Sequence, residues 1–329
     1  MLQKLLTALS LCLIGGPLFA LCNAPSYLDR LNPPETGEIA SYAKELLYGN
    51  GTHWVATRNG KTLNIVGTIH VADPRLAPVM RDLQPWMTQA DLILLEATPQ
   101  DEIALQNAIQ SDPTALFLPD GPTLADRLDD DTWQRLVDAA AARGAPAAIV
   151  AKLQPWYLMI LLALPPCALA EIAAGERGLD HLIMQAATDA AIPMQALEPF
   201  DTLLKIFQDG TLEEQLEMLS LGIMDTDAQE EMLTAMRDSY FTEDIGMLMG
   251  LSRVVAKHIP GLDPETALKL TQDSEDLVLA QRNLAWMPVI GKAAANHDKI
   301  LVAVGAAHLS GEQGLLRLLE NDGWTLSRR

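Results

Sequence analysis

Two stretches near opposite ends of the chain share one pattern, in which an apolar run leads into Gly, two further residues and His. The first is IVGTIH at residues 65–70, and the second is AVGAAH at residues 303–308. Short apolar runs of this kind favour buried β-strands. A Gly directly after a strand lets the backbone turn sharply, so that a His three residues later lies over the carboxyl edge of the sheet. Ligands bind at that edge in α/β sheets.

The region around the first motif predicts strands joined by short connections. Residues 54–56 and 63–66 flank Asn59-Gly60, a dipeptide suited to a tight hairpin because both turn positions must accept positive φ. A helical segment is expected at 74–89. The unbroken apolar run 92–95 then predicts a central strand that ends at Glu96.

Between this region and the second motif the sequence is mainly helical. Several helices are expected over 101–174, another begins at Gly178-Leu179-Asp180, and residues 203–296 are almost all helical, with a loop at 258–264. A short strand at 192–197 leads to Glu198. After the strand 299–304, a capping box from Ser310 to Gln313 predicts a helix start, and 324–326 predicts a final strand.

The chain length and composition are compatible with one α/β domain. It has 329 residues, of which 49% are hydrophobic, enough for a large core. No linker marks a boundary. We expect a central mixed β-sheet whose strand ends carry the two Gly-x-x-His motifs, with a large helical insertion between the amino-terminal and carboxyl-terminal β-units.

The first 22 residues are typical of a secretory signal. Lys4 precedes an apolar run from 5 to 21 that is broken by Gly15-Gly16-Pro17, whereas a membrane span needs about 20 predominantly apolar residues. Cleavage is expected between residues 20 and 24, after Ala20, Cys22 or Ala24, although Pro25 argues against Ala24. The mature domain, residues 23–329, is therefore expected in the periplasm or outside the cell, without a membrane span.

The cysteines and the charge restrict the partners. Cys12 and Cys22 are expected to leave with the signal, so that Cys167 has no partner and serves as a small buried hydrophobe. The 43 acidic and 23 basic residues give a net charge of -20, which repels phosphate backbones. Nucleic acid is excluded as a partner, and a peptide or small-molecule substrate is expected.

Four ionisable residues are expected at the same edge of the sheet, because each follows a predicted strand. They are His70, Glu96, Glu198 and His308. Imidazole and carboxylate groups together suit a divalent metal ion such as zinc, cobalt or manganese, with an open position for a water that the metal makes acidic. A single Gly-x-x-His is a weak signal, and a lone His is more often a hydrogen-bonded structural group than a ligand.

The chain also resembles the TraB/GumN family, which is related to the Tiki metalloproteases and more distantly to the erythromycin esterase and ChaN-like group. The resemblance rests on both Gly-x-x-His motifs, on 91–96, 178–180, 196–198 and 282–283, and on the segment 311–316, and it spans about residues 51–326. It implies an α/β fold with both motifs in one pocket and, for Tiki-like members, metal-dependent peptide-bond hydrolysis. His70 and His308 match the motif histidines, Glu96 matches an acidic strand end, and Arg282 matches a family arginine that orients a carboxylate or stabilises an oxyanion.

Three functions are compatible with these residues. The leading one is an exported metal-dependent hydrolase of a peptide or amide bond, with His70, His308, Glu96 and Glu198 as ligands and Glu96 and Arg282 as catalytic groups. The second is a hydrolase without metal, in which His70 activates water, Glu96 orients it and Arg282 stabilises charge. The third is a non-catalytic envelope protein that binds a peptide or a polymer.

Overall fold

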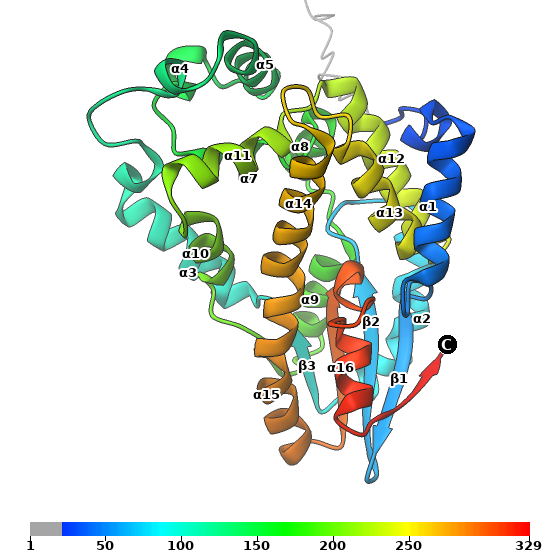
Figure 1. Cartoon of the computed structure of the whole chain (residues 1–329). Coiled ribbons are helices and arrows are strands. Elements are labelled where there is room, and N and C mark those ends of the chain that lie inside the picture. Colours follow the sequence, from blue (N-terminus) through cyan, green and yellow to red (C-terminus); the bar gives the residue numbers. More distant parts are fainter. Residues whose placement is uncertain (1–21) are drawn as a thin grey trace, which may run out of the picture.

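The protein is built around one mixed sheet (Figure 1). The structure is a computed structural model, and residues 22–329 are described. The strand order is β4-β3-β5-β2-β1-β6. Neighbours among β4, β3, β5 and β2 are parallel, and β1 is antiparallel to both β2 and β6. The bounds are β1 His53–Arg58, β2 Lys61–Thr68, β3 Leu92–Leu95, β4 Met194–Ala196, β5 Lys299–Gly305 and β6 Thr325–Arg328. The predicted class, a single α/β domain with a mixed central sheet, is confirmed.

The hairpin between β1 and β2 forms for the predicted reason. Arg58 pairs with Lys61 across the turn. Asn59 and Gly60, between them, have φ values of 50° and 79°. Asn and Gly tolerate this left-handed conformation, and the turn it produces matches the twist of the strands.

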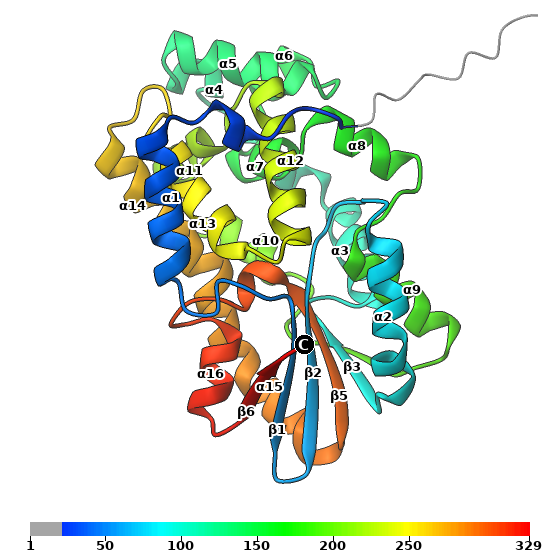
Figure 2. The same ribbon diagram turned by 90° about the vertical axis from the view of Figure 1, so that its right-hand side faces the viewer.

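Alternate residues of the strands pack into two cores, one on each face of the sheet. On one face, Ile65 and Val302 pack with α15 (Gln281–Asn296) and α16 (Leu315–Asn321). On the other, Val66 and Leu301 pack with α2 (Leu76–Gln89) and α9 (Leu179–Asp189). Figure 2 shows these two helix pairs on opposite sides of the strands. Burial on both faces explains the nearly continuous apolar runs of β3 and β5.

The other helices form a layer beyond the carboxyl ends of the parallel strands (Figures 1 and 2). The segments between β3 and β5 supply most of them, as the predicted helical insertion requires, and parts of this layer have cores of their own. The bounds are α1 Pro33–Glu45, α3 Pro99–Ser111, α4 Leu124–Arg127, α5 Asp130–Ala141, α6 Ala147–Val150, α7 Pro155–Leu162, α8 Pro166–Ala173, α10 Thr202–Gln208, α11 Leu212–Gly222, α12 Thr226–Phe241, α13 Ile245–Ala256 and α14 Pro264–Glu275.

Short helical turns complete the set of elements. They are the 3-10 turns η1 Tyr27–Arg30, η2 Pro113–Leu116 and η4 Ala306–His308, and the π-helix η3 Asp276–Ala280. Within residues 22–329, no single helix is long and apolar enough to cross a membrane. The pair α7 and α8 reaches that length and composition only together, with a bend of 78° between its members.

The helix expected after β5 is present, but its predicted start at the Ser310 capping box was wrong. The chain instead forms a turn in which Gly311 has a φ of 92° and α16 begins only at Leu315. Gly314 donates its N–H to the Gly311 carbonyl. A side chain on Gly314 would lie 2.3 Å from the Ser310 carbonyl oxygen, so the turn requires glycine there.

The prediction that Cys167 has no partner was also wrong. Cys22 and Cys167 form a disulfide with a Cα–Cα distance of 5.3 Å. The sequence argument had assigned Cys22 to the predicted signal. Residues 1–21 of that predicted signal lie outside the described residues.

Candidate active site

The first Gly-x-x-His motif is packed tightly against the start of α9. The Leu179 N–H donates to the Ile69 carbonyl at 2.8 Å. A Cβ on Gly178 would lie only 2.4 Å from the carbonyl carbon of His70, so only glycine allows this approach. The contact brings the first turn of α9, and therefore Asp180, next to the His70 ring.

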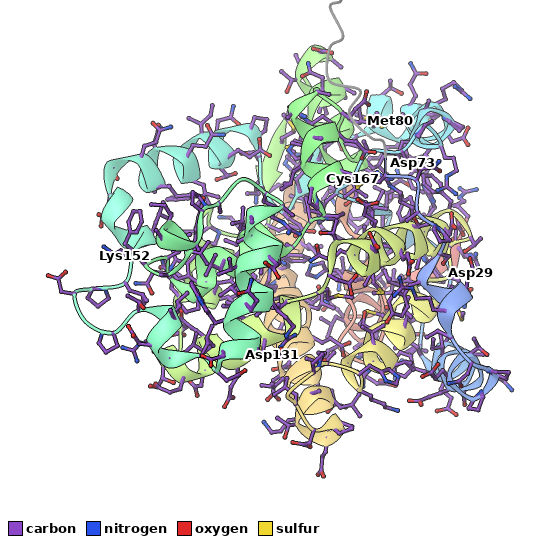
Figure 3. All side chains as sticks on the ribbon, turned by 90° about the horizontal axis from the view of Figure 1, so that it is seen from above. Asp29, Asp73, Met80, Asp131, Lys152 and Cys167 are labelled. Atoms are coloured by element: carbon purple, nitrogen blue, oxygen red, sulfur yellow. A yellow bond between two sulfur atoms is a disulfide. The ribbon has the colours of Figure 1, made fainter. Side chains whose placement is uncertain are left out.

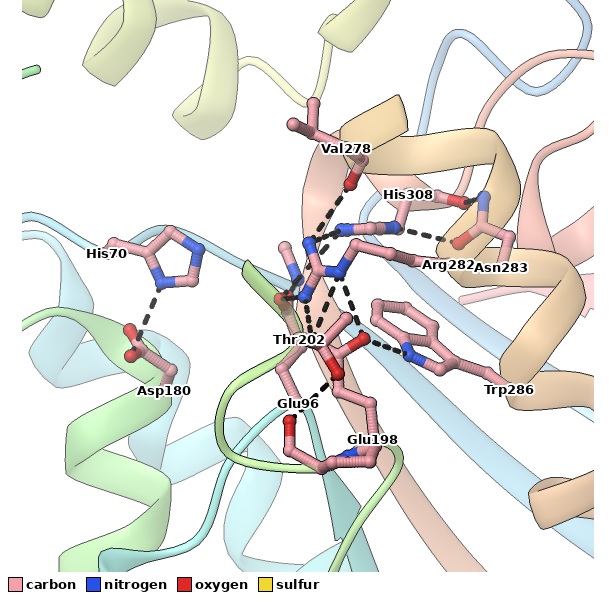
Figure 4. Close-up of polar contacts among 12 residues, drawn as sticks. His70, Glu96, Asp180, Glu198, Thr202, Val278, Arg282, Asn283, Trp286 and His308 are labelled. Atoms are coloured by element: carbon pink, nitrogen blue, oxygen red, sulfur yellow. Dashed lines mark hydrogen bonds and ion pairs between the residues drawn. The ribbon is translucent and has the colours of Figure 1, made fainter. Parts of the chain in front are cut away.

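His70 and Asp180 form an ion pair at the opening of the site (Figure 4). Nδ1 of His70 lies 3.3 Å from Oδ2 of Asp180, which also lies 2.9 Å from Nδ1 of His181. The far nitrogen of His181 contacts Glu102 at 2.8 Å. Partial desolvation of the ring by the surrounding protein lowers the pKa of His70, but the Asp180 carboxylate and the charge of Glu96 outweigh it and raise this pKa to about 9.

The second motif lies beside the first because β2 and β5 are parallel neighbours. Thr68 pairs with Gly305 in the sheet. A Cβ on Gly67 would lie 2.9 Å from the Cα of Ala306, so the two motif backbones touch. A Cβ on Gly305 would lie 3.4 Å from His70 Nε2 and 3.3 Å from Glu96 Oε1. The side chains of His70 and Glu96 therefore both approach the Cα of Gly305 and lie close to each other there.

Glu96 is held at this point from two sides. Its Oε1 accepts the Gly305 N–H at 2.7 Å, and its Oε2 accepts a hydrogen bond from Arg282 Nη2 at 2.6 Å. Burial opposes the ionisation of Glu96, but the nearby His308, His70 and Arg282 outweigh it and lower its pKa to about 2. The carboxylate is therefore ionised at neutral pH.

Arg282 is the centre of the buried network, and only 5% of it is exposed. Its Nε donates to both oxygens of Glu198, and its Nη2 donates to Glu198 and Glu96. Its Nη1 donates to the Val278 carbonyl at 3.0 Å and to Nε2 of His308 at 3.2 Å. A guanidinium has five N–H donors, and all five have partners in this arrangement. Arg282 therefore fixes the positions of other side chains and has no donor left for an oxyanion.

A local change in helix geometry precedes Arg282. In η3 (Asp276–Ala280) the Gln281 N–H bonds to the carbonyl of Asp276, five residues back. Short π-helical segments are frequent at functional sites because they shift the register of the helix. The Val278 carbonyl, which lies in this segment, accepts the Arg282 side chain.

His308 is buried and fully bonded, with 3% of it exposed. Nδ2 of Asn283 donates to the carbonyls of His308 and Gln313. Oδ1 of Asn283 therefore faces Nδ1 of His308 at 2.8 Å and accepts a hydrogen bond from its N–H. In this tautomer Nε2 of His308 has no proton, and its lone pair accepts the hydrogen bond from Nη1 of Arg282. Burial lowers the pKa of His308 to about 4, and the charge of Arg282 adds to the effect. Trp286 packs on the ring with a centroid distance of 4.4 Å.

The structure brings all five predicted site residues to one edge of the sheet, but their surroundings differ. His70 has a 63% exposed side chain, and no described residue bonds to its Nε2. Glu96 is partly exposed and keeps Oε1 on the His70 side. Glu198, Arg282 and His308 form the buried part, where Trp286 donates to Glu198 at 2.8 Å.

Three residues of the network had no role in the sequence argument. They are Asp180 in the first turn of α9, Trp286 in α15, and Asn283, which entered only as part of a family motif. The family resemblance rests partly on the segments 178–180 and 282–283. These segments were the signal in the sequence that could have indicated Asp180 and Asn283 as site residues. The cap of α9 is Gly178.

The four predicted metal ligands do not fit a metal centre as they are arranged. Nε2 of His308 and both oxygens of Glu198 face N–H donors. Only His70 Nε2 faces no described N–H donor. Glu96 Oε1 lies beside it and accepts one N–H, from Gly305. These two atoms are the available ligand atoms, whereas catalytic zinc sites typically use three protein ligands. Correspondingly, among residues 22–329, no three His, Cys, Asp or Glu side chains are arranged so that they could hold a metal ion.

Comparisons with known proteins cover most of the chain. A family model described as the TraB/PrgY/gumN family matches residues 52–328. The uncharacterized protein YbaP of Escherichia coli (strain K12) is 24% identical over 289 residues, which are 84% of this chain and 99% of YbaP. The uncharacterized YbaP of Shigella flexneri matches with the same identity and coverage.

Proposed function

The chain belongs to the TraB/PrgY/gumN family, and on this basis we propose that it is an exported hydrolase of peptide or amide bonds in which His70 is the reactive group. One observation supports this proposal most directly. Of the five predicted site residues, His70 combines an exposed ring with an Nε2 that has no described partner. Asp180 contacts Nδ1 of the ring. Oε1 of Glu96 lies on the side of Nε2.

In the proposed reaction, His70 takes a proton from water at Nε2 while the water oxygen attacks the carbonyl carbon of the substrate. The Asp180 carboxylate stabilises the imidazolium that forms, and the same proton then passes to the leaving amine. Neutral His70 is required for the first step. Glu96 and Asp180 favour its protonated form, so the reactive fraction increases with pH.

Arg282 and His308 have positioning roles in this proposal. Arg282 forms ion pairs with Glu96 and Glu198 and holds Oε2 of Glu96, which leaves Oε1 directed toward His70. His308 accepts from Arg282 and is neutral because its pKa is low. Neither side chain is assigned a proton transfer.

A metal-dependent hydrolase is the second candidate. One observation favours it. Asp180 contacts Nδ1 of His70, and a histidine that binds a metal through one ring nitrogen usually donates its other N–H to a carboxylate in the same way. The two available ligand atoms are one fewer than such sites typically use. We therefore derive no step through a metal.

The experiment uses a mixture of unmodified peptides and measures the release of new amino groups by the mature protein. His70→Gln and Asp180→Asn are compared with His258→Gln, which alters an exposed His that pairs with Glu35 at 2.8 Å. We expect loss of hydrolysis in His70→Gln, a large reduction in Asp180→Asn and none in His258→Gln. Retained hydrolysis in His70→Gln would refute the proposal.

Chelation separates the two candidates. Activity that survives a chelator, in protein whose metal content is measured by elemental mass spectrometry, supports His70 as a base that acts without metal. Activity that is lost with the chelator and restored by zinc, cobalt or manganese supports the second candidate instead.

A further inference from the structure

The first ten described residues are an integral part of the fold. We call residues 22–31 the amino-terminal strap. Tyr27, Leu28 and Leu31 of the strap pack against a core formed by α1, α12 and α13. The Ala24 carbonyl accepts a hydrogen bond from the Thr234 hydroxyl at 2.9 Å. The strap therefore has specific partners along its whole length.

The disulfide joins the beginning of this strap to α8. Cys167 is 7% exposed and lies in the first turn of α8. The backbone N–H of Cys22 donates to Oε1 of Glu171, and Arg237 pairs with the other oxygen of Glu171 at 2.6 Å. Both members of this ion pair are buried. The Cys22 end of the strap is thus held by a covalent bond and by a buried polar contact.

The strap also borders a cavity near His70. Cys22 and Ala24 line one side of a cavity of about 1100 Å³. The segment 72–77, which follows His70, and Arg177, which precedes Gly178, line it as well. Figure 3 shows Cys167, Asp73 and Met80 close together on one side of the molecule, away from Asp131 and Lys152 of the helical insertion.

We propose that the chain is cut on the amino side of Cys22, after Ala20, and that Cys22 remains in the mature protein as the disulfide partner of Cys167. Of the three cleavage positions compatible with the sequence, cuts after Cys22 or Ala24 would separate Cys22 from the strap. A cut after Ala20 keeps the complete strap and its contacts. Leu21 is then the first residue of the mature chain.

Formation of the disulfide requires an oxidising compartment. The two thiols lose two electrons and two protons, and the disulfide of a thiol oxidoreductase in that compartment accepts them and becomes a dithiol. The bond therefore forms after export. This inference is independent of the proposed hydrolysis, because it involves no residue assigned to the reaction.

The first test is the intact mass and amino-terminal sequence of protein exported by a bacterial host and alkylated during lysis. We expect Leu21 as the first residue, no alkylation of Cys22 or Cys167, and alkylation of both after reduction. A variant that lacks residues 2–20 and stays in the cytoplasm is expected to have both thiols free. A mature chain that begins at Asn23 or Pro25, an uncut leader, or thiols that alkylate before reduction would overturn the proposal.

Single substitutions provide a second test. Cys22→Ser and Cys167→Ser are each expected to lower the Tm of the exported protein by about 5 °C or more, because the bond closes a long loop. The double variant is expected to lose no more than either single one. If Cys22→Ser left the Tm unchanged, Cys22 would not be bonded in the mature protein.

Discussion

Replacement of Arg282 by Met is expected to destabilise the fold strongly, because the side chain forms ion pairs with two carboxylates that have little contact with water. The Glu198 and Glu96 side chains are 9% and 17% exposed. Removing one partner of a buried ion pair typically costs about 3 to 5 kcal/mol, since the remaining charge stays buried and unpaired. Met preserves much of the apolar stem, so the loss measures mainly the missing charge and hydrogen bonds.

Equilibrium unfolding in urea at pH 7, followed by tryptophan fluorescence, measures this loss. Adding Glu198→Gln to Arg282→Met is expected to recover part of the free energy of unfolding, because one of the two unpaired charges is removed. Arg317→Met is the matched control. Arg317 pairs with Glu320 on the surface, with 36% and 44% of the side chains exposed, and loss of such a pair costs at most about 1 kcal/mol.

The loss of unfolding free energy in Arg282→Met is expected to depend on pH in a defined direction. Arg282 contributes to the low pKa of Glu96, which is about 2. The stabilisation linked to this carboxylate is present at neutral pH and is lost as the pH falls through about 2. In Arg282→Met the Glu96 carboxylate is expected to protonate at higher pH, so the difference from the wild type is expected to shrink between pH 7 and 4. A loss below about 1 kcal/mol at pH 7, or one that does not change on acidification, would refute this view of Arg282.

The remaining predictions concern pH and backbone contacts. Because the pKa of His70 is about 9, kcat/KM is expected to rise about tenfold per pH unit below that value and level off above it; a flat profile between pH 6 and 8 argues against His70 as the base. The pKa of His308 falls from 6.5 to about 4, so about 3 kcal/mol of stability is expected to disappear as the pH falls through this interval. Urea midpoints measure it, and His308→Gln should remove this dependence. Gly178→Ala is expected to displace His70 and abolish hydrolysis, whereas Gly37→Ala, with open space around it, should leave hydrolysis unchanged.

The strands could be predicted from the sequence because their signals are local. Asn59-Gly60 specifies its turn by backbone conformation alone. The runs that became β3 and β5 are apolar on both faces because both faces are covered. Residues that directly follow such strands, such as Glu96, could therefore be placed at the carboxyl edge without a structure.

The roles within the site depend on contacts between distant segments, which a single sequence does not reveal. Asp180 in the first turn of a helix has an ordinary explanation as a cap, and its contact with His70 requires the close approach of Gly178. Glu198 has the chemistry of a metal ligand, but both of its oxygens accept hydrogen bonds from Arg282, which lies 84 positions later in the sequence. The disulfide was missed because Cys22 had been assigned to the expected signal.

The position of β5 has a consequence for the order in which the candidate site assembles. This strand comes late in the sequence but lies between β3 and β2 in the sheet. A chain that is still emerging during synthesis or transport contains the β1–β2 hairpin and the β3–β4 pair, but not the strand that joins them. Glu96 also lacks the Gly305 N–H until that point. Long-range pairing of this kind is slow to form. The amino-terminal portion therefore cannot assemble the site alone, and the site is complete only after β5 has joined the sheet.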